Sequence, residues 1–200
     1  KKLNGEIVSG DSMQVYQEVE IGTAKATKEE QAEVKHYLVN TRSVFEPYSV
    51  KDFVDQATAA ITEISKKGKL PIIVGGTGFY VNALLNKMQL GEKTDQEKSV
   101  TQKWENYLTE NGAEKLWQQL HDKDPVAAEK IPIPNSRRTL RALTVIDRTG
   151  KKFSEQQEKI EPRYDYLIIA LNSKRAKIYD RINQRVDKMM DLGMLDEARF

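Results

Sequence analysis

Two short glycine-containing stretches carry residues that could bind an anion or move a proton. Gly75-Gly76-Thr77-Gly78 follows an apolar run and precedes a helical pattern, so it offers backbone N–H groups, a helix dipole and a hydroxyl to an anion. Asp11 follows a strand-like segment, where a carboxylate could act as a general base or hydrogen-bond to the ligands of a magnesium ion. The simpler alternatives are that Thr77 caps the helix and that Asp11 stabilises a turn.

Two sets of arginines have helical spacing and could bind phosphates. Arg181 and Arg185 lie one turn apart, as in a clamp for a diphosphate, but an exposed face paired with nearby carboxylates would have the same spacing. Arg137, Arg138 and Arg141 could contact RNA phosphates, and the same alternative applies to them. The net charge of the chain is only +2, although residues 131–200 carry 15 Lys and Arg against 10 Asp and Glu.

The composition excludes several kinds of protein and site. With 200 residues and 38% hydrophobic content, the chain is long enough for one substantial core, and its mean hydropathy of −0.65 is typical of a globular protein. No apolar window could span a membrane, the first residues lack a signal peptide, and we expect a cytoplasmic protein. Zero cysteines exclude disulfides, iron–sulfur clusters and thiolate zinc, and His36 and His121 lie far apart. The pattern GxxxxGK[ST] of a Walker A loop does not occur in this sequence.

Alternating strands and helices would position Asp11, Thr77 and Arg185. Strands are predicted over residues 6–9, 70–74 and 166–171, the second with the apolar character of a buried parallel strand. Helices are predicted from Ser49 to Gly68, from about residue 79 to 88, and from 174 to 192. The residues predicted to face inward are, in the first helix, Phe53, Ala57, Ala60, Ile61 and Ile64, and, in the last, Ile178, Ile182, Val186 and Met189.

Residues 92–161 show helical patterns without strands and therefore predict a helical insertion. Asp124-Pro125 is a helix start, and Ser136 could cap a further helix that ends near Gly150. That helix would bury Leu140, Leu143 and Ile146 and present its arginines on another side.

Four motifs in order resemble the tRNA dimethylallyltransferases, also called tRNA isopentenyltransferases. They are Gly10-Asp11-Ser12-Met13-Gln14-Val15-Tyr16, Ile21-Gly22-Thr23-Ala24-Lys25, Val74-Gly75-Gly76-Thr77-Gly78-Phe79-Tyr80 and Arg181-Ile182-x-x-Arg185-Val186-Asp187. Asp124-Pro125-x-Ala127-Ala128 and Arg138-x-x-Arg141-Ala142-Leu143 fit the same family. The resemblance extends over essentially the whole chain.

The resemblance implies an α/β fold, with a P-loop-kinase-like parallel sheet core and an all-helical insertion domain. Residues 1–91 would form the first part of the catalytic core, 92–161 the tRNA-binding insertion and 162–200 the second part of the core. Members of the family begin with a strand and a P-loop that would precede residue 1, and they continue beyond residue 200. By this comparison, the core is expected to lack its P-loop strand and to be truncated at its end.

The resemblance also implies a reaction, in which a dimethylallyl group passes from its diphosphate to the exocyclic amine of the adenosine just 3′ of the anticodon. Asp11 would be the general base, Thr77 would lie beside the reacting base and the diphosphate, and Arg185 would hold the diphosphate. The residues that would contact tRNA are Asp11, Ser12, Met13, Gln14, Arg137, Arg138 and Arg141. Implied partners are the anticodon stem-loop, dimethylallyl diphosphate and Mg²⁺, and the protein is expected to be a monomer. One departure is Ile131-Pro132-Ile133-Pro134-Asn135, which stands where the family has Ile-His-Pro-Asn.

Two other kinds of function share parts of this pattern. A P-loop kinase acting on a small molecule or nucleotide would share the core, but it would not need a helical insertion that carries an arginine cluster. A non-catalytic RNA-binding module would fit the missing Walker loop, but it gives no reason for Asp11 and Thr77 to occur in their motifs. The sequence therefore favours the transferase over these two alternatives.

Overall fold

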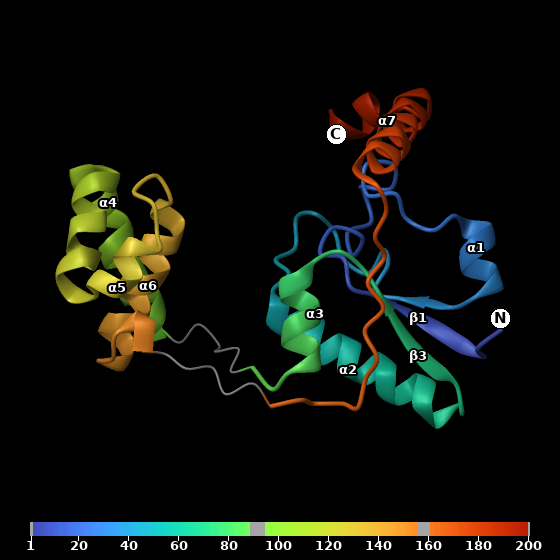
Figure 1. The fold of residues 1–200 in the computed structure, drawn as a ribbon, viewed down its shortest axis with the longest axis horizontal. Helices are drawn as coiled ribbons and strands as arrows, with labels where there is room; N and C mark the ends of the chain where they lie inside the picture. Colours follow the sequence, from blue (N-terminus) through green and yellow to red (C-terminus); the bar gives the residue numbers. More distant parts are fainter. Residues whose placement is uncertain (1, 89–94, 156–160, 200) are drawn as a thin grey trace. The chain divides into compact units, whose positions relative to one another are not determined.

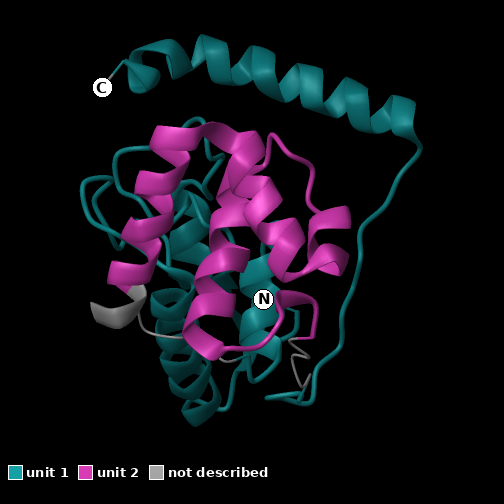
Figure 2. Ribbon diagram, turned by 90° about the vertical axis from the view of Figure 1, so that its left-hand side faces the viewer, with its two compact units in different colours: residues 1–90, 160–200 teal, residues 91–159 magenta. Residues whose placement is uncertain are grey.

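A computed structural model describes residues 2–88, 95–155 and 161–199 of the chain (Figure 1). It divides into two compact units, which are described separately (Figure 2). Unit 1 comprises residues 1–90 and 160–200, and unit 2 comprises residues 91–159. The domain boundary expected after residue 91 lies outside the described residues.

Unit 1 is built on a parallel sheet, as the sequence predicted. The strands β1 (Gly5–Ser9), β2 (His36–Tyr37) and β3 (Leu70–Val74) lie in the order β2-β1-β3. Ile7 of β1 is in register with His36 on one side and with Ile72 on the other. Because all three strands are parallel, their carboxyl ends meet at one edge, where Asp11 and the glycine-rich turn follow β1 and β3.

Helix α2 (Val50–Lys66) supplies much of the core of unit 1. Ser49 and Asp52 form the predicted capping box, and the five apolar residues expected to face inward are all buried. They pack with Val8 of β1 and with Ala83 and Leu84 of α3 (Gly78–Leu85). The short helix α1 (Lys28–Glu33) precedes β2. At the end of α2, Gly68 has a φ of +66°, a conformation that favours glycine, so the predicted stop is confirmed.

Two predictions about strands were wrong. β3 is not fully buried, because it lies at an edge of the described sheet and leaves Leu70 and Val74 about half exposed. Residues 166–171 form no strand, and the side chain of Leu171 is 96% exposed. An apolar composition favours a strand, but the strand also needs a partner for its N–H and C=O groups, and the described part of the chain provides none there.

The last two helices of unit 1 are α7 (Arg175–Asp191) and α8 (Met194–Ala198). The predicted long helix is confirmed, but its predicted inner face is only partly correct. Met189 is buried and Ile178 half-buried, whereas Ile182 is 48% and Val186 45% exposed. The helical period places these residues on one face, but it does not specify how much of the protein covers that face.

Unit 2 is helical, and its longest element changes direction at a glycine. Helix α4 (Asp95–Lys123) contains Gly112 with φ 82° and ψ 171°, a non-helical conformation that essentially only glycine adopts. The core of the unit contains Trp104 and Leu116 from the two sides of this break, together with Leu143. Trp117 packs beside them and donates to the carbonyl of Ile131 at 2.7 Å.

The end of unit 2 contains α5 (Pro125–Glu129), α6 (Ser136–Thr149) and the 3-10 helix η1 (Phe153–Glu155). Buried Asp124 caps α5 and also accepts the N–H and O–H of Ser154, each at 2.7 Å. Asn135, rather than the predicted Ser136, caps α6, because its side chain reaches the N–H of Arg138. The predicted apolar side of α6 is confirmed, and the helix ends at Gly150 in the left-handed conformation.

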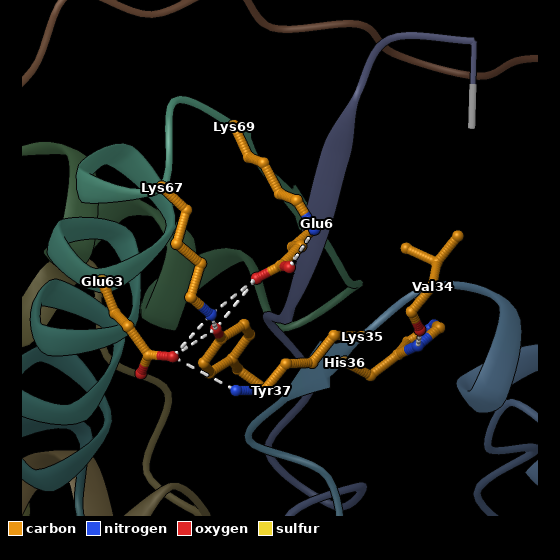
Figure 3. A network of polar contacts seen from close by, with 8 residues as sticks. All are labelled: Glu6, Val34, Lys35, His36, Tyr37, Glu63, Lys67 and Lys69. Atoms are coloured by element: carbon orange, nitrogen blue, oxygen red, sulfur yellow. Dashed lines mark hydrogen bonds and ion pairs between the residues drawn. The ribbon is translucent and has the colours of Figure 1, made fainter.

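A polar network fixes the strands of unit 1 near the beginning of β1 (Figure 3). The buried carboxylate of Glu6 accepts hydrogen bonds from Lys69 Nζ at 2.6 Å and from the Tyr37 hydroxyl at 2.9 Å. Lys69 and Tyr37, with the nearby Lys67, lower the pKa of Glu6 to about 2. Glu63 of α2 accepts from Lys67 at 2.7 Å, and its carboxylate also lies 2.9 Å from the Tyr37 hydroxyl, whose single proton is shared between Glu63 and Glu6. The network connects β1, β2 and α2. Because Glu6 lies near the beginning of β1, these contacts are separate from the carboxyl end of the sheet, where Asp11 lies.

Candidate active site

The loops after β1 and β3 are in direct backbone contact. Gly10 donates its N–H to the carbonyl of Val74 at 2.8 Å, and Thr77 donates its N–H to the carbonyl of Gly10 at 3.3 Å. A Cβ added to Gly75 would lie 2.3 Å from the carbonyl carbon of Gly10. The close approach therefore requires glycine at position 75, and it places Asp11 and Thr77 at the same edge of the sheet.

The Thr77 side chain joins the two loops. Its hydroxyl accepts the N–H of Ser12 at 2.9 Å and donates to the Ser12 Oγ at 3.2 Å. Although Thr77 occupies the N-cap position of α3, its side chain makes no capping hydrogen bond. The alternative in which Thr77 is the N-cap residue of α3 is therefore confirmed for its position, but its side chain fixes the segment that contains Asp11 rather than the helix end.

Asp11 is held in a turn by one of its two carboxylate oxygens. Oδ1 accepts the N–H of Met13 at 2.9 Å, and the residue is half-buried. Among the residues that the structure describes, Oδ2 has no hydrogen-bond partner. The turn interaction and a role in proton transfer can therefore coexist, because they use different oxygens.

Two of the residues predicted to contact tRNA also make hydrogen bonds within the protein. The Ser12 hydroxyl is engaged by Thr77, and Gln14 accepts from Ser9 at 2.9 Å and donates to the carbonyl of Thr23 at 3.1 Å. Met13 lies between them and is 50% exposed. The geometry therefore gives Ser12 and Gln14 a role in holding the loop after β1, and leaves Met13 open to a partner.

Asp11 and Arg185 line one pocket of about 420 Å³. Met13, Gly22, Thr23 and Glu197 are also part of its lining. Thr77 is not part of the lining. Among the predicted site residues, the structure therefore brings Asp11 and Arg185 to one pocket, and it joins Thr77 to Ser12 by a hydrogen bond.

Arg185 is exposed, and within the described ranges no ion pair joins it to a carboxylate. The alternative of a salt-bridged helix face formed with Asp180 and Asp187 is therefore not observed for Arg185. Arg185 therefore lines the pocket without a carboxylate partner among the described residues.

The arginine cluster belongs to unit 2. Arg137, Arg138 and Arg141 lie in the first two turns of α6 and are exposed. They share a helix whose opposite side packs into the core of unit 2 through Leu143, so their side chains face away from that core.

Sequence reasoning missed two residues that hold the loop after β1. Lys25 donates to the Tyr16 carbonyl and to Asn40 Oδ1, and partial burial lowers its pKa. Glu197 of α8 accepts hydrogen bonds from three successive backbone N–H groups, those of residues 20–22. Partial burial acts to raise the pKa of Glu197, but these N–H groups outweigh it and the net shift is downward. Lys25 belongs to a motif that the sequence singled out, whereas no pattern pointed to Glu197.

Neither a metal centre nor a membrane-spanning helix is found among the described residues. In the described part of the chain, no group of three or more His, Asp or Glu side chains is placed to hold a metal ion. None of the described helices combines the length and the apolar character needed to cross a bilayer.

The chain is similar to proteins that modify tRNA. The model of a family described as IPP transferase matches residues 14–200. The tRNA dimethylallyltransferase of Lactobacillus acidophilus is 78% identical over the whole of this chain, and that of Lactobacillus helveticus is 76% identical. In both cases this chain spans 65% of the relative's length.

Solved structures give the same result. The tRNA isopentenylpyrophosphate transferase of Bacillus halodurans is 43% identical, with a TM-score of 0.64 over 99% of this chain and 61% of its own. A eukaryotic dimethylallyltransferase described as acting on tRNA is 34% identical, with a TM-score of 0.81 over 98% of this chain and 49% of its own. These matches favour the transferase prediction over the kinase alternative.

Proposed function

The chain belongs to the IPP transferase family, and from this premise we propose that it transfers a dimethylallyl group from dimethylallyl diphosphate to tRNA. The acceptor would be the exocyclic amine of the adenosine just 3′ of the anticodon. The observation that carries this proposal is the pocket lined by both Asp11 and Arg185, because a carboxylate there could accept a proton and a guanidinium there could bind a diphosphate.

Asp11 would supply the base of the reaction. As the adenine nitrogen bonds to the allylic carbon, its N–H proton passes to Oδ2 of Asp11, the oxygen that the turn does not use. The hydrogen bond from Met13 to Oδ1 keeps the carboxylate oriented during this step. General-base catalysis of this kind is worth about 10² to 10⁴-fold in rate.

Arg185 would stabilise the leaving group. The bond between the allylic carbon and the diphosphate oxygen breaks, and the diphosphate leaves with the electron pair and gains negative charge. A guanidinium can donate two parallel hydrogen bonds to phosphate oxygens, and such electrostatic stabilisation is often the largest contribution to catalysis. Because Arg185 lines the pocket without a carboxylate partner among the described residues, its charge is not neutralised before the substrate binds.

Thr77 and Ser12 would position the reacting groups. Their mutual hydrogen bonds connect the turn after β3 to the segment that carries Asp11, so both loops keep one arrangement. A stacked adenine cannot enter the pocket, and flipping it out of the anticodon loop costs a few kcal/mol. The exposed arginines of α6 in unit 2 would help to offset this cost by binding tRNA phosphates.

Magnesium would reduce the charge of the bound diphosphate. The described residues do not by themselves form a site for it, although Mg²⁺ commonly takes most of its ligands from water and substrate phosphates. The proposal therefore assigns magnesium to the substrate rather than to a dedicated protein site. We further propose that the protein acts as a monomer in the cytoplasm.

The experiment is prenyl transfer by the intact gene product. Radiolabelled dimethylallyl diphosphate is incubated with Mg²⁺ and a tRNA that has adenosine 3′ of its anticodon, and with a matched tRNA that has guanosine at that position. We expect label only in the first tRNA. Equal labelling of both tRNAs would contradict the proposal. A protein that labels neither tRNA but transfers phosphate from ATP to a small molecule would also contradict it.

A further inference from the structure

The carboxylate of Glu197 is bound by three successive backbone N–H groups of the loop after β1. The N–H groups of Glu20 and Ile21 donate to Oε2 at 2.7 and 2.8 Å, and that of Gly22 donates to Oε1 at 2.9 Å. Successive N–H groups that converge in this way form an anion-binding nest, and hydrogen bonds to a carboxylate are stronger than those between neutral groups. Glu197 therefore connects α8 to a loop that lies far away in the sequence.

This connection matters because α7, the helix that carries Arg185, is covered by little of the protein. Met189 is its one buried residue, while Ile182 and Val186 of its apolar face remain about half exposed. Apolar packing therefore contributes little to the position of α7. Helix α8 follows directly after the turn at Gly193, so a contact that fixes α8 also restrains the end of α7.

The connection also lies at the pocket. Gly22, Glu197 and Arg185 line the same cavity as Asp11. We propose that Glu197 is a positioning residue, which sets Arg185 at its working distance from Asp11 by holding α8 on the loop of residues 20–22. This inference rests on the proposed prenyl transfer, because it assigns to Glu197 the placement of the diphosphate-binding arginine.

The test compares two substitutions on α8 in the intact gene product. Glu197→Gln removes the charge and presents an NH₂ group to at least one N–H donor. Asp196→Asn is the matched control, because the Asp196 side chain is 85% exposed and contacts only Arg199 among the described residues. We expect Glu197→Gln to lower kcat/KM for dimethylallyl diphosphate about 100-fold, as expected for a misplaced catalytic group, and to leave the Kd for tRNA nearly unchanged. We expect Asp196→Asn to match the parent.

A double substitution distinguishes positioning from a general loss of stability. If Glu197 acts through Arg185, Glu197→Gln should have little further effect on kcat/KM once Arg185→Gln is present. If the two effects multiply, or if Glu197→Gln behaves like Asp196→Asn, the inference is wrong. Should Glu197→Gln fail to fold, Glu197→Asp is used, which keeps the charge but shortens the side chain. Prenyl transfer by Glu197→Asp at the parent rate would also overturn the inference, whereas an inactive parent would instead refute the proposed function.

Discussion

The substitution Asp11→Asn separates a catalytic role from a structural one. Asparagine keeps a carbonyl oxygen where Oδ1 accepts the N–H of Met13 at 2.9 Å, so the turn should survive. We therefore expect the free energy of unfolding to change by no more than about 1 kcal/mol. The amide cannot take the proton of the adenine amine, so the chemical step should slow by at least about 100-fold.

The assay is single-turnover prenyl transfer by the intact gene product, with enzyme in excess over tRNA, together with thermal melting and tRNA binding. Single-turnover conditions separate chemistry from product release. Asp11→Ala is a useful second variant, because it removes both oxygens and should add a loss of stability of about 1 kcal/mol to the loss of rate. If Asp11→Asn transfers the prenyl group within about threefold of the parent rate but melts at a lower temperature, Asp11 is a turn residue and the mechanism is wrong.

Three further predictions concern the loops, the arginine cluster and the network of Figure 3. Thr77→Val removes the hydroxyl that accepts the N–H of Ser12 at 2.9 Å, so the free energy of unfolding measured by chemical denaturation should fall by about 1–3 kcal/mol. Thr77→Ser keeps a hydroxyl and should have nearly the stability of the parent. Equal stabilities of the two variants would contradict this role. Arg137→Ala combined with Arg141→Ala should weaken tRNA binding, and the salt dependence of binding should fall by the amount expected for the loss of about two phosphate contacts. The Kd for dimethylallyl diphosphate should not change. An unchanged salt slope would refute the assignment. The pKa of Glu6 is lowered from 4.5 to about 2, so its ionised form stabilises the fold above pH 4.5, and this contribution is lost as the pH falls toward 2. Melting temperatures should therefore show Glu6→Gln below the parent at pH 7 and approaching it near pH 2, and a difference independent of pH would exclude this cause.

Local patterns predicted much of the fold because their physical causes are local. The capping box of Ser49 and the period of α2 depend on residues three or four positions apart, and both were found as expected. The parallel sheet was predicted from apolar runs separated by helical patterns, whereas the pairing of β1 with β3 was seen only in the structure. The segment 166–171 failed because a strand exists only where a partner accepts its hydrogen bonds, which is information that the segment itself does not contain.

The candidate site was less predictable than the fold. Asp11, Thr77 and Arg185 could be named from their motifs, but the sequence could not show that the side chain of Thr77, the N-cap residue of α3, binds Ser12. Glu197 gave no signal, because its partners are backbone N–H groups, which every residue type except proline provides. Interactions between a side chain and a distant backbone are specified by the fold and become visible only in the structure.

The central claim is that Asp11 and Arg185 act on one substrate complex in one pocket. The most direct test is a crystal structure of the intact gene product with tRNA and a non-reactive thio analogue of dimethylallyl diphosphate. We expect the exocyclic nitrogen of the flipped adenine within about 2.6–3.2 Å of Asp11 Oδ2, and the guanidinium of Arg185 in contact with the diphosphate. An adenine bound elsewhere, or a diphosphate that does not touch Arg185, would contradict the claim.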